Sequence, residues 1–178
     1  MVESTRLARE GEAVRYRTEP AARDIDALRE LVSVTPEFSP AERMVALELL
    51  EERSARGVAS GYFFIFAQAR EELIAFAAWG PIPLTESSYD LYWIVVHPAH
   101  QRAGVGRGLI ELTEQTVAAR GGGRLYIETS SREEYARARD FYRCAGYSEI
   151  ARFEHFYASN DGKVVYCKRI SAVEPAAE

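Results

Sequence analysis

The sequence predicts an α/β fold of the α+β kind, with a mixed sheet of about seven strands and helices on both faces. Short apolar runs alternate with amphipathic segments, which gives the order β-α-α-β-β-β-α-β-α-β-β. The length of 178 residues suits one core that buries roughly 70% of the unfolded surface, and is short for two domains. Hydrophobic residues make up 47% of the chain and charged residues 28%, as in ordinary globular proteins. We expect one domain over 13–170, with flexible ends at 1–12 and 171–178.

The first part of the chain predicts one strand followed by two helices. Residues 13–17 alternate apolar and basic side chains, as a half-buried strand does. A helix opens near Asp24, and a second begins at Ser39-Pro40, an N-cap followed by a first-turn proline. Gly57 ends the second helix. Their inner faces are predicted to consist of Ile25, Leu28, Leu31 and Val32, and of Met44, Leu47 and Leu50, respectively.

Three apolar runs in the middle predict buried strands at 62–67, 73–79 and 91–96. The polar link between the first two predicts a hairpin, and Gly80-Pro81 marks a loop before the third. A helix through about Ala119 follows, and Gly121–Gly123 ends it. The remaining elements are predicted as a strand at 125–129, a helix at 133–144, and two final strands at 147–156 and 164–169 around an Asn160-Asp161-Gly162 turn.

A glycine-rich segment, Gln101 to Gly108, lies between a strand and a helix. The first backbone N–H groups of a helix have no intrahelical partner, and the helix dipole there favours an anion. Glycines at 104 and 106 let a phosphate approach the backbone, and two arginines add positive charge. A Walker A loop is excluded because no Lys-Ser or Lys-Thr follows, and a Rossmann fingerprint because Leu109 replaces its last glycine. The alternative is a glycine turn that only connects two elements.

The pattern Gln101-Arg102-x-Gly104-x-Gly106, directly after Val96-His97-Pro98, resembles the coenzyme A loop of the GNAT acetyltransferase superfamily. A second segment, 138–147, resembles the tyrosine helix and Gly-aromatic pair of that family, although Tyr135 stands where an asparagine is usual. The resemblance implies a mostly antiparallel sheet and acetyl-coenzyme A as co-substrate. The residues that it places on the cofactor are Ile94, Val95, Val96, Gln101, Arg102, Ala103, Gly104, Val105, Gly106 and Arg107.

The strand Leu125-Tyr126-Ile127-Glu128 is most similar to that of ribosomal-protein N-terminal acetyltransferases. An alkylamine with a pKa near 10 must lose a proton before it attacks a thioester. Glu128, a carboxylate in an apolar strand, is our first candidate for the base, and Asp90 is the second. By the resemblance, Tyr142 protonates the departing thiolate and a backbone N–H of Ile94–Val96 stabilises the developing oxyanion.

Charge and composition limit the classes of partner. The net charge of −5 lacks the basic excess of a nucleic-acid binder. No apolar stretch reaches the ~18 residues of a membrane helix, and the first residues lack the apolar run of a signal peptide. The two cysteines have no ligand spacing, so no metal is expected, and free thiols fit a reducing cytoplasm.

The sequence is compatible with three functions, two of which differ in the acceptor. A small-molecule amine comes first, a protein amine (a terminal α-amine or a lysine) second, and a non-catalytic acyl-coenzyme A sensor third. Tyr142 together with an acidic residue argues against the sensor, because a sensor uses neither an acid nor a base. The resemblance also leads us to expect a homodimer.

Overall fold

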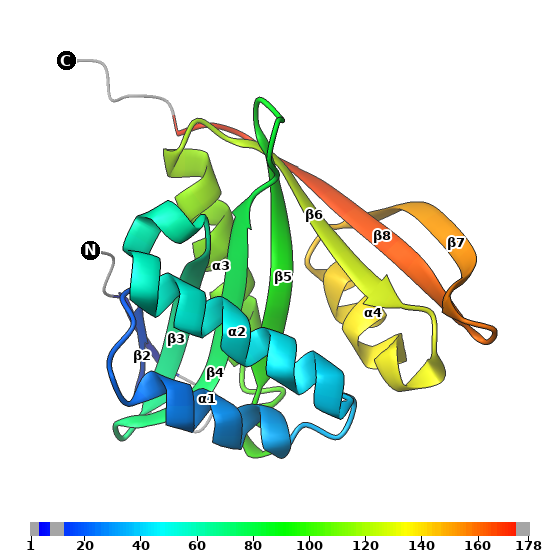
Figure 1. The fold of residues 1–178 in the computed structure, drawn as a ribbon. Helices are drawn as coiled ribbons and strands as arrows, with labels where there is room; N and C mark the ends of the chain where they lie inside the picture. The colour runs from blue at the N-terminus through cyan, green and yellow to red at the C-terminus, as the bar shows by residue number, and fades with distance from the viewer. Residues whose placement is uncertain (1–3, 8–12, 174–178) are drawn as a thin grey trace. The chain divides into compact units, whose positions relative to one another are not determined.

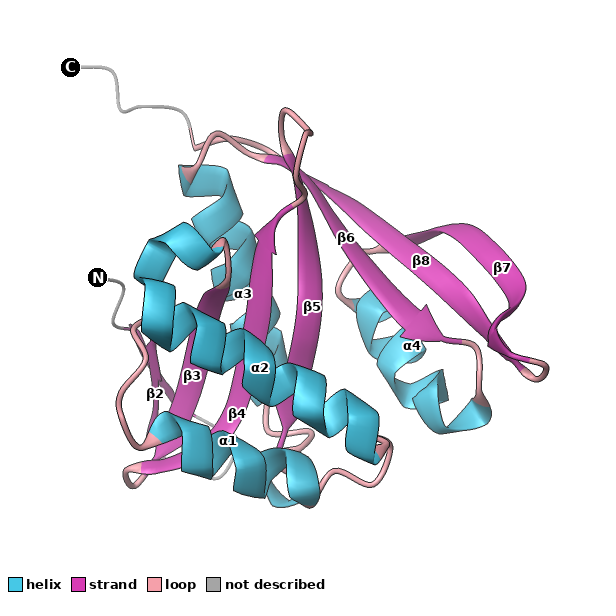
Figure 2. Ribbon diagram, viewed as in Figure 1, coloured by secondary structure: helices cyan, strands magenta, loops and turns pink. Residues whose placement is uncertain are grey.

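The computed structural model describes residues 4–7 and 13–173 (Figures 1 and 2). The described residues form four α-helices, at Asp24–Ser33 (α1), Pro40–Arg56 (α2), Val105–Ala119 (α3) and Ala136–Cys144 (α4). The strands are Ser4–Leu7 (β1), Ala13–Arg17 (β2), Phe63–Ala69 (β3), Glu72–Pro81 (β4), Ser88–Val96 (β5), Gly123–Ser130 (β6), Ser148–Ala158 (β7) and Asp161–Ile170 (β8).

The predicted fold class and element order are confirmed, with two local differences. Strand β1 was not predicted, and it pairs antiparallel with β2 inside a segment that we expected to be flexible. The helix predicted at 133–144 begins as a 3₁₀ turn over Glu133–Tyr135 before α4. The rest of the expected flexible ends falls largely at 1–3, 8–12 and 174–178, outside the described residues.

The chain divides into two compact units, which together use all the strands. The first comprises Met1–Gly80 and Trp93–Thr113, and the second Pro81–Tyr92 and Glu114–Glu178. Both β5 and α3 contribute residues to each unit. The single domain expected over 13–170 stays a prediction.

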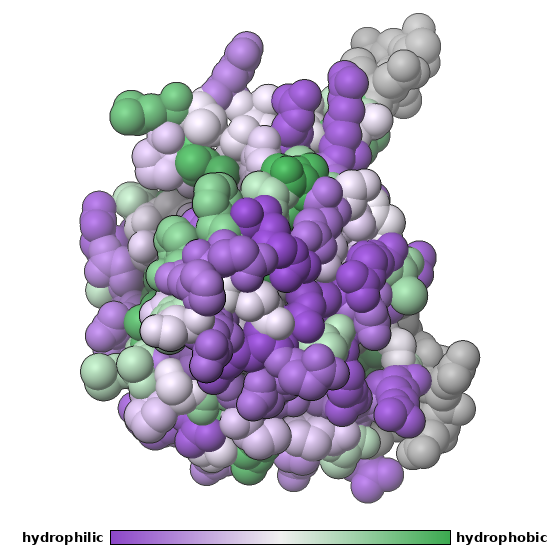
Figure 3. Space-filling model, turned by 90° about the vertical axis from the view of Figure 1, so that its right-hand side faces the viewer, coloured by the Kyte–Doolittle hydropathy of each residue, from purple (hydrophilic) through white to green (hydrophobic). Residues whose placement is uncertain are grey.

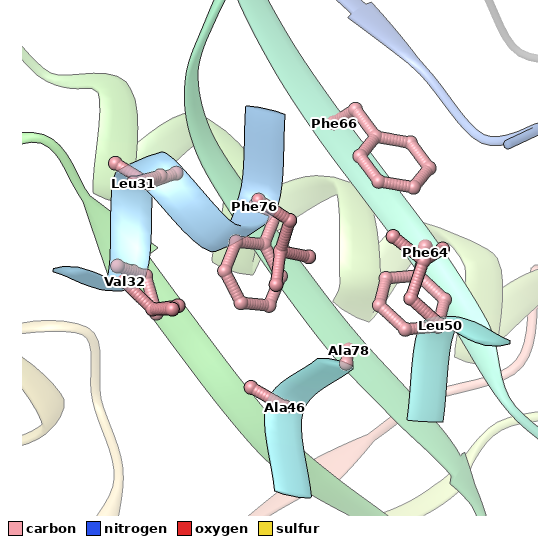
Figure 4. Packing of buried hydrophobic residues seen from close by; sticks show 10 residues of the cluster. Leu31, Val32, Ala46, Leu50, Phe64, Phe66, Phe76 and Ala78 are labelled. Atoms are coloured by element: carbon pink, nitrogen blue, oxygen red, sulfur yellow. The ribbon is translucent and has the colours of Figure 1, made fainter. Parts of the chain in front are cut away.

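In the first unit, the strand order is β1-β2-β3-β4-β5, and α1 and α2 cover one face of the sheet (Figure 1). Figure 4 shows the apolar side chains of both helices turned toward those of β3 and β4. Alternate strand residues therefore face the helices, as expected for a period of two. This core cluster consists of Leu28, Leu31, Val32, Ala46, Leu50, Phe64, Phe66, Phe76, Ala78 and Val95.

Local polar contacts fix where α1 and α2 begin. The buried Asp24 carboxylate accepts hydrogen bonds from Arg17 Nη1 at 2.8 Å and from the Ala21 backbone N–H at 2.7 Å. Ser39 and Glu42 form a capping box at the start of α2, which confirms the predicted N-cap. The prediction for Met44 was wrong, because its side chain is 61% exposed.

The opposite face of the first unit's sheet packs against the first part of α3. The Tyr16 hydroxyl of β2 donates to the Val105 carbonyl at 3.3 Å. A Cβ atom at Gly108 would lie 2.3 Å from that hydroxyl oxygen, so only glycine allows this approach. The expected helices on both faces are thus present (Figure 1).

In the second unit, β6 pairs parallel with β5 and antiparallel with β8, and β7 forms the edge. Helix α4 packs on the face of this sheet that carries Tyr166, whose ring centroid lies 5.8 Å from that of Tyr142. The surface viewed in Figure 3 is mostly hydrophilic, with hydrophobic residues in small groups. No helix in the described ranges is long and apolar enough to cross a membrane.

Candidate active site

The glycine-rich loop lies in the first unit and has a defined backbone. The His97 ring nitrogen Nδ1 accepts a hydrogen bond from the Ala99 N–H at 3.2 Å, and the Gln101 side-chain amide donates to the Val96 carbonyl at 3.2 Å. The chain then turns through left-handed conformations, with φ of 64° at Arg102 and 88° at Gly104. These contacts connect the end of β5 directly to the start of α3.

The start of α3 offers backbone N–H groups to an anion. The Gly108 N–H donates to the Gly104 carbonyl at 3.0 Å, which closes the first turn. The N–H groups of Val105 and Gly106 precede this bond and have no intrahelical acceptor. A Cβ atom at Gly104 would have no atom within 4 Å, so the space beside this glycine is open. The loop therefore has the backbone features of an anion site at the start of a helix.

The side chains around the loop differ in what they contribute. Arg107 pairs with Glu111 one helical turn later, at 2.8 Å, so part of its charge is already neutralised. The Val95 side chain is buried in the core of the first unit, which leaves its backbone as the part that could bind a ligand. Gly108 was not singled out from the sequence, and its role is to pack against Tyr16.

The two candidate carboxylates lie on one face of the second unit's sheet. Asp90 on β5 is directly opposite Tyr126 on β6, and Glu128 follows two residues later on the same face. Both Glu128 oxygens accept from Lys163 Nζ of β8 at 3.1 Å. The structure thus places the two carboxylates that were proposed as the base on one face. It also adds a lysine that the sequence did not indicate.

Among the residues on this face, Asp90 has a raised pKa. The pKa of this half-buried group is raised from 3.8 to about 6, and burial is the largest cause. The negative charge of Glu128 also contributes to this rise, and the Lys163 ammonium opposes it. A carboxylate with a pKa near 6 is largely ionised at neutral pH and still takes up a proton more readily than an ordinary aspartate.

Tyr142 lies on the other face of the same sheet. Its side chain is 7% exposed and contacts the Tyr166 ring, and Tyr166 is opposite Ile127 in the β6–β8 pairing. Ile127 alternates with Glu128, so α4 and the two carboxylates lie on opposite sides of β6. Burial raises the pKa of Tyr142 above its ordinary value, and the phenol stays neutral at physiological pH.

The pairing between β5 and β6 is short within the second unit. It consists of Ser88 with Arg124, Tyr89 with Leu125, and Asp90 with Tyr126, although both strands continue beyond these residues. This parallel pair is the point at which the antiparallel pattern of the sheet is interrupted. Asp90 is the last residue of β5 in that pairing.

The profile described as "Acetyltransferase (GNAT) family" matches residues 25–147. The chain belongs to this family. That match covers more than half of the sequence and includes the glycine loop, both candidate carboxylates and Tyr142. By family, the protein is an enzyme of the N-acetyltransferase class.

Solved GNAT structures share the fold over most of the chain. A putative acetyltransferase of the GNAT family from Desulfovibrio desulfuricans is 39% identical, with a TM-score of 0.87, over 89% of this chain and 99% of that one. The ribosomal-protein-S18-alanine N-acetyltransferase from Escherichia coli is 20% identical, with a TM-score of 0.69, over 92% and 99%. An aminoglycoside 6'-N-acetyltransferase complexed with coenzyme A is 19% identical, with a TM-score of 0.66, over 89% and 99%. A comparison with curated protein sequences finds no match.

The tyrosine helix of this acetyltransferase is anchored at both ends by residues that sequence reasoning missed. Arg139 Nη1 donates to the Ser130 and Arg132 carbonyls, each at 2.7 Å, and ties the helix to the end of β6. Lys168 Nζ donates to the Ala145 carbonyl at 2.9 Å and to both Glu114 oxygens at 2.8 Å. The available signal for the second anchor was a lysine directly after the apolar run at 164–167 of β8.

Histidine, cysteine and acidic side chains are the residues that bind metal ions in proteins. The part of the chain that the structure describes contains no cluster of three such side chains able to hold a metal ion. Cys144 is exposed and Cys167 is half-buried, and both are free thiols.

Proposed function

We propose that this GNAT enzyme transfers the acetyl group of acetyl-coenzyme A to the amine of a small molecule. The observation that supports the proposal most strongly is the half-buried Asp90, with its pKa raised to about 6, beside Glu128 on one face of the sheet. An acyl-coenzyme A sensor would gain nothing from a carboxylate adjusted in this way.

The glycine loop fits the cofactor by its backbone. The N–H groups of Val105 and Gly106 are suited to the pyrophosphate, and the positive φ at Gly104 turns the chain to present them. Arg102 and Gln101 flank the same turn, and Ala103 separates the arginine from the glycine. Acetyl-coenzyme A supplies an acetyl group activated as a thioester.

Asp90 is the proposed base. It removes a proton from the acceptor ammonium, directly or through a water molecule, and so makes the amine nucleophilic. Glu128 helps by keeping a second negative charge on the same face, which raises the pKa of Asp90. This reverses the order of the two candidates that the sequence alone suggested.

Backbone and phenol groups complete the proposed chemistry. By resemblance to the family, we expect backbone N–H groups of Ile94–Val96 to stabilise negative charge on the acetyl oxygen. Tyr142, neutral and buried, gives its proton to the departing sulfur. Because the carboxylates lie on the opposite face of β6, the proton that Asp90 removes and the proton that Tyr142 delivers are kept apart.

Calorimetric titration with acetyl-coenzyme A, followed by thiol release across a panel of amines and peptides, tests the proposal. We expect binding, and thiol release with a small primary amine. Release with peptides alone would assign the protein-acceptor activity instead. Binding without release on any acceptor would favour the sensor, and absence of binding would overturn the cofactor assignment. A cytoplasmic location and a homodimer remain our predictions.

A further inference from the structure

Lys163 fixes a positive charge on the sheet face that carries the proposed base. Its Nζ lies 3.1 Å from both Glu128 oxygens and 4.1 Å from the centroid of the Phe156 ring. The Phe153 ring is also near, at 5.7 Å. The lysine side chain is only 16% exposed, whereas that of Glu128 is 50% exposed. The ammonium is therefore held in place between a carboxylate and aromatic rings.

The part of this face around Asp90, Glu128 and Lys163 carries one net negative charge when both carboxylates are ionised. Asp90 and Glu128 contribute two negative charges when ionised, and Lys163 contributes one positive charge. The register of β6 and β8 places two more cations, Arg124 and Arg169, on the same face toward its other end. An acceptor ammonium beside Asp90 is attracted by the two carboxylates. A second ammonium on the same acceptor is repelled by Lys163 or by the arginines.

Exposed aromatic rings border the same lysine. Phe153 and Phe156 are 50% and 53% exposed, and Tyr157, which contacts the Phe156 ring edge-on at 4.9 Å, is 50% exposed. Large exposed apolar side chains gathered beside a charged group are typical of ligand or partner contacts. They suit the uncharged, apolar part of an acceptor.

We propose that Lys163 makes this acetyltransferase selective for acceptors with a single positive charge attached to an apolar group. The ammonium of such an acceptor lies beside Asp90 and Glu128, and its apolar part lies against the exposed rings. Acceptors with several ammonium groups are disfavoured because the lysine charge repels the second one. This inference rests on the proposed function, since it names the class of amine that the same site takes.

The test compares two amines that differ by one ammonium, 4-methylbenzylamine and 1,4-bis(aminomethyl)benzene. The ratio of their kcat/KM values is measured by thiol release at saturating acetyl-coenzyme A. We expect the unmodified enzyme to prefer the monoamine by about tenfold, the size of one screened charge contact near a protein surface. Lys163→Met should bring the ratio to about one, and Lys163→Arg should restore the preference.

The chain provides a matched control because Lys163 and Lys168 are its only lysines. Lys168 also pairs with a glutamate, Glu114, but belongs to the other set of alternating residues in β8. Lys168→Met removes the same charge from the protein and should leave the ratio unchanged, whatever its effect on folding. A ratio that responds equally to both substitutions would reflect net charge and would overturn the proposal.

Three further outcomes separate this inference from the proposed function. Equal or faster turnover of the diamine by the unmodified enzyme would overturn the role of Lys163 and leave the acetyltransferase assignment intact. The same holds if an aminoglycoside is acetylated and the monoamine is refused. Absence of thiol release with every acceptor and of acetyl-coenzyme A binding would instead remove the proposed function itself.

Discussion

Replacing Asp90 with asparagine should make the protein more stable and less active at the same time. The pKa of this carboxyl is raised from 3.8 to about 6 in the folded chain, so the folded state holds the proton more tightly than the unfolded state does. Folding therefore loses stability as the pH rises through this interval. A difference of about two pH units corresponds to about 3 kcal/mol, and solvent contact of the half-buried group reduces this to about 1 kcal/mol.

Asparagine is neutral at every pH and does not incur that loss. Asp90→Asn should raise the melting temperature by about 2–4 °C at about pH 8 and give no gain at about pH 4. Thermal unfolding at both pH values, with thiol release measured on the same samples, is the assay. Turnover should fall about 10²–10⁴-fold, the usual contribution of a general base.

The control for this experiment is Asp140→Asn. Asp140 is an exposed carboxylate that pairs with Arg143 on α4, and its loss should change stability by less than about 0.5 kcal/mol. A gain for Asp90→Asn of the same size at both pH values would refute the argument that burial of its charge is the cause. Turnover that survives the substitution would refute the assignment of Asp90 as the base.

Three further predictions concern the acid, the loop and the second carboxylate. Tyr142→Phe should lower turnover at least about tenfold and leave the calorimetric affinity for acetyl-coenzyme A within about twofold, and unaffected turnover would exclude this tyrosine as the acid. Gly104→Ala should weaken acetyl-coenzyme A binding about tenfold in the same titration, whereas Gly61→Ala, with a similar φ of 78° and equally open space, should not; equal losses would indicate backbone strain alone. The acidic limb of the pH profile of kcat/KM is expected near pH 6, from Asp90. Glu128→Gln should shift this limb to lower pH by about one unit, because it removes a negative charge that raises the pKa of Asp90. A limb that stays at the same pH would contradict the coupling of the two carboxylates.

Much of the fold could be predicted because its signals are local. Apolar runs, the Ser39 cap and the glycine breaks depend on neighbours within one or two turns, and the elements between them appear where expected. The buried face of α2 was harder to predict, because residues spaced by three move gradually around a helix of 3.6 residues per turn. Ala46, Leu50 and Arg53 are buried instead of Met44, and Arg53 is the unexpected one because its partner, Glu19, comes from a distant segment.

The sequence suggested candidate residues for the site, but it did not indicate which charged side chains would meet there. Glu128 and Lys163 are 35 residues apart, and they meet only because β8 pairs antiparallel with β6. That register depends on the whole sheet and leaves no local pattern. The face that each residue occupies has the same origin, so the separation of Tyr142 from the carboxylates could not be read from the sequence.

Strand β5 limits the insertions and deletions that this enzyme can tolerate. It contains Asp90 and, four residues later, Ile94, and a period of two gives these residues the same alternation along the strand. Inserting one residue between them would turn every later side chain and amide of β5 to the other face. Insertions or deletions inside this strand should therefore be poorly tolerated.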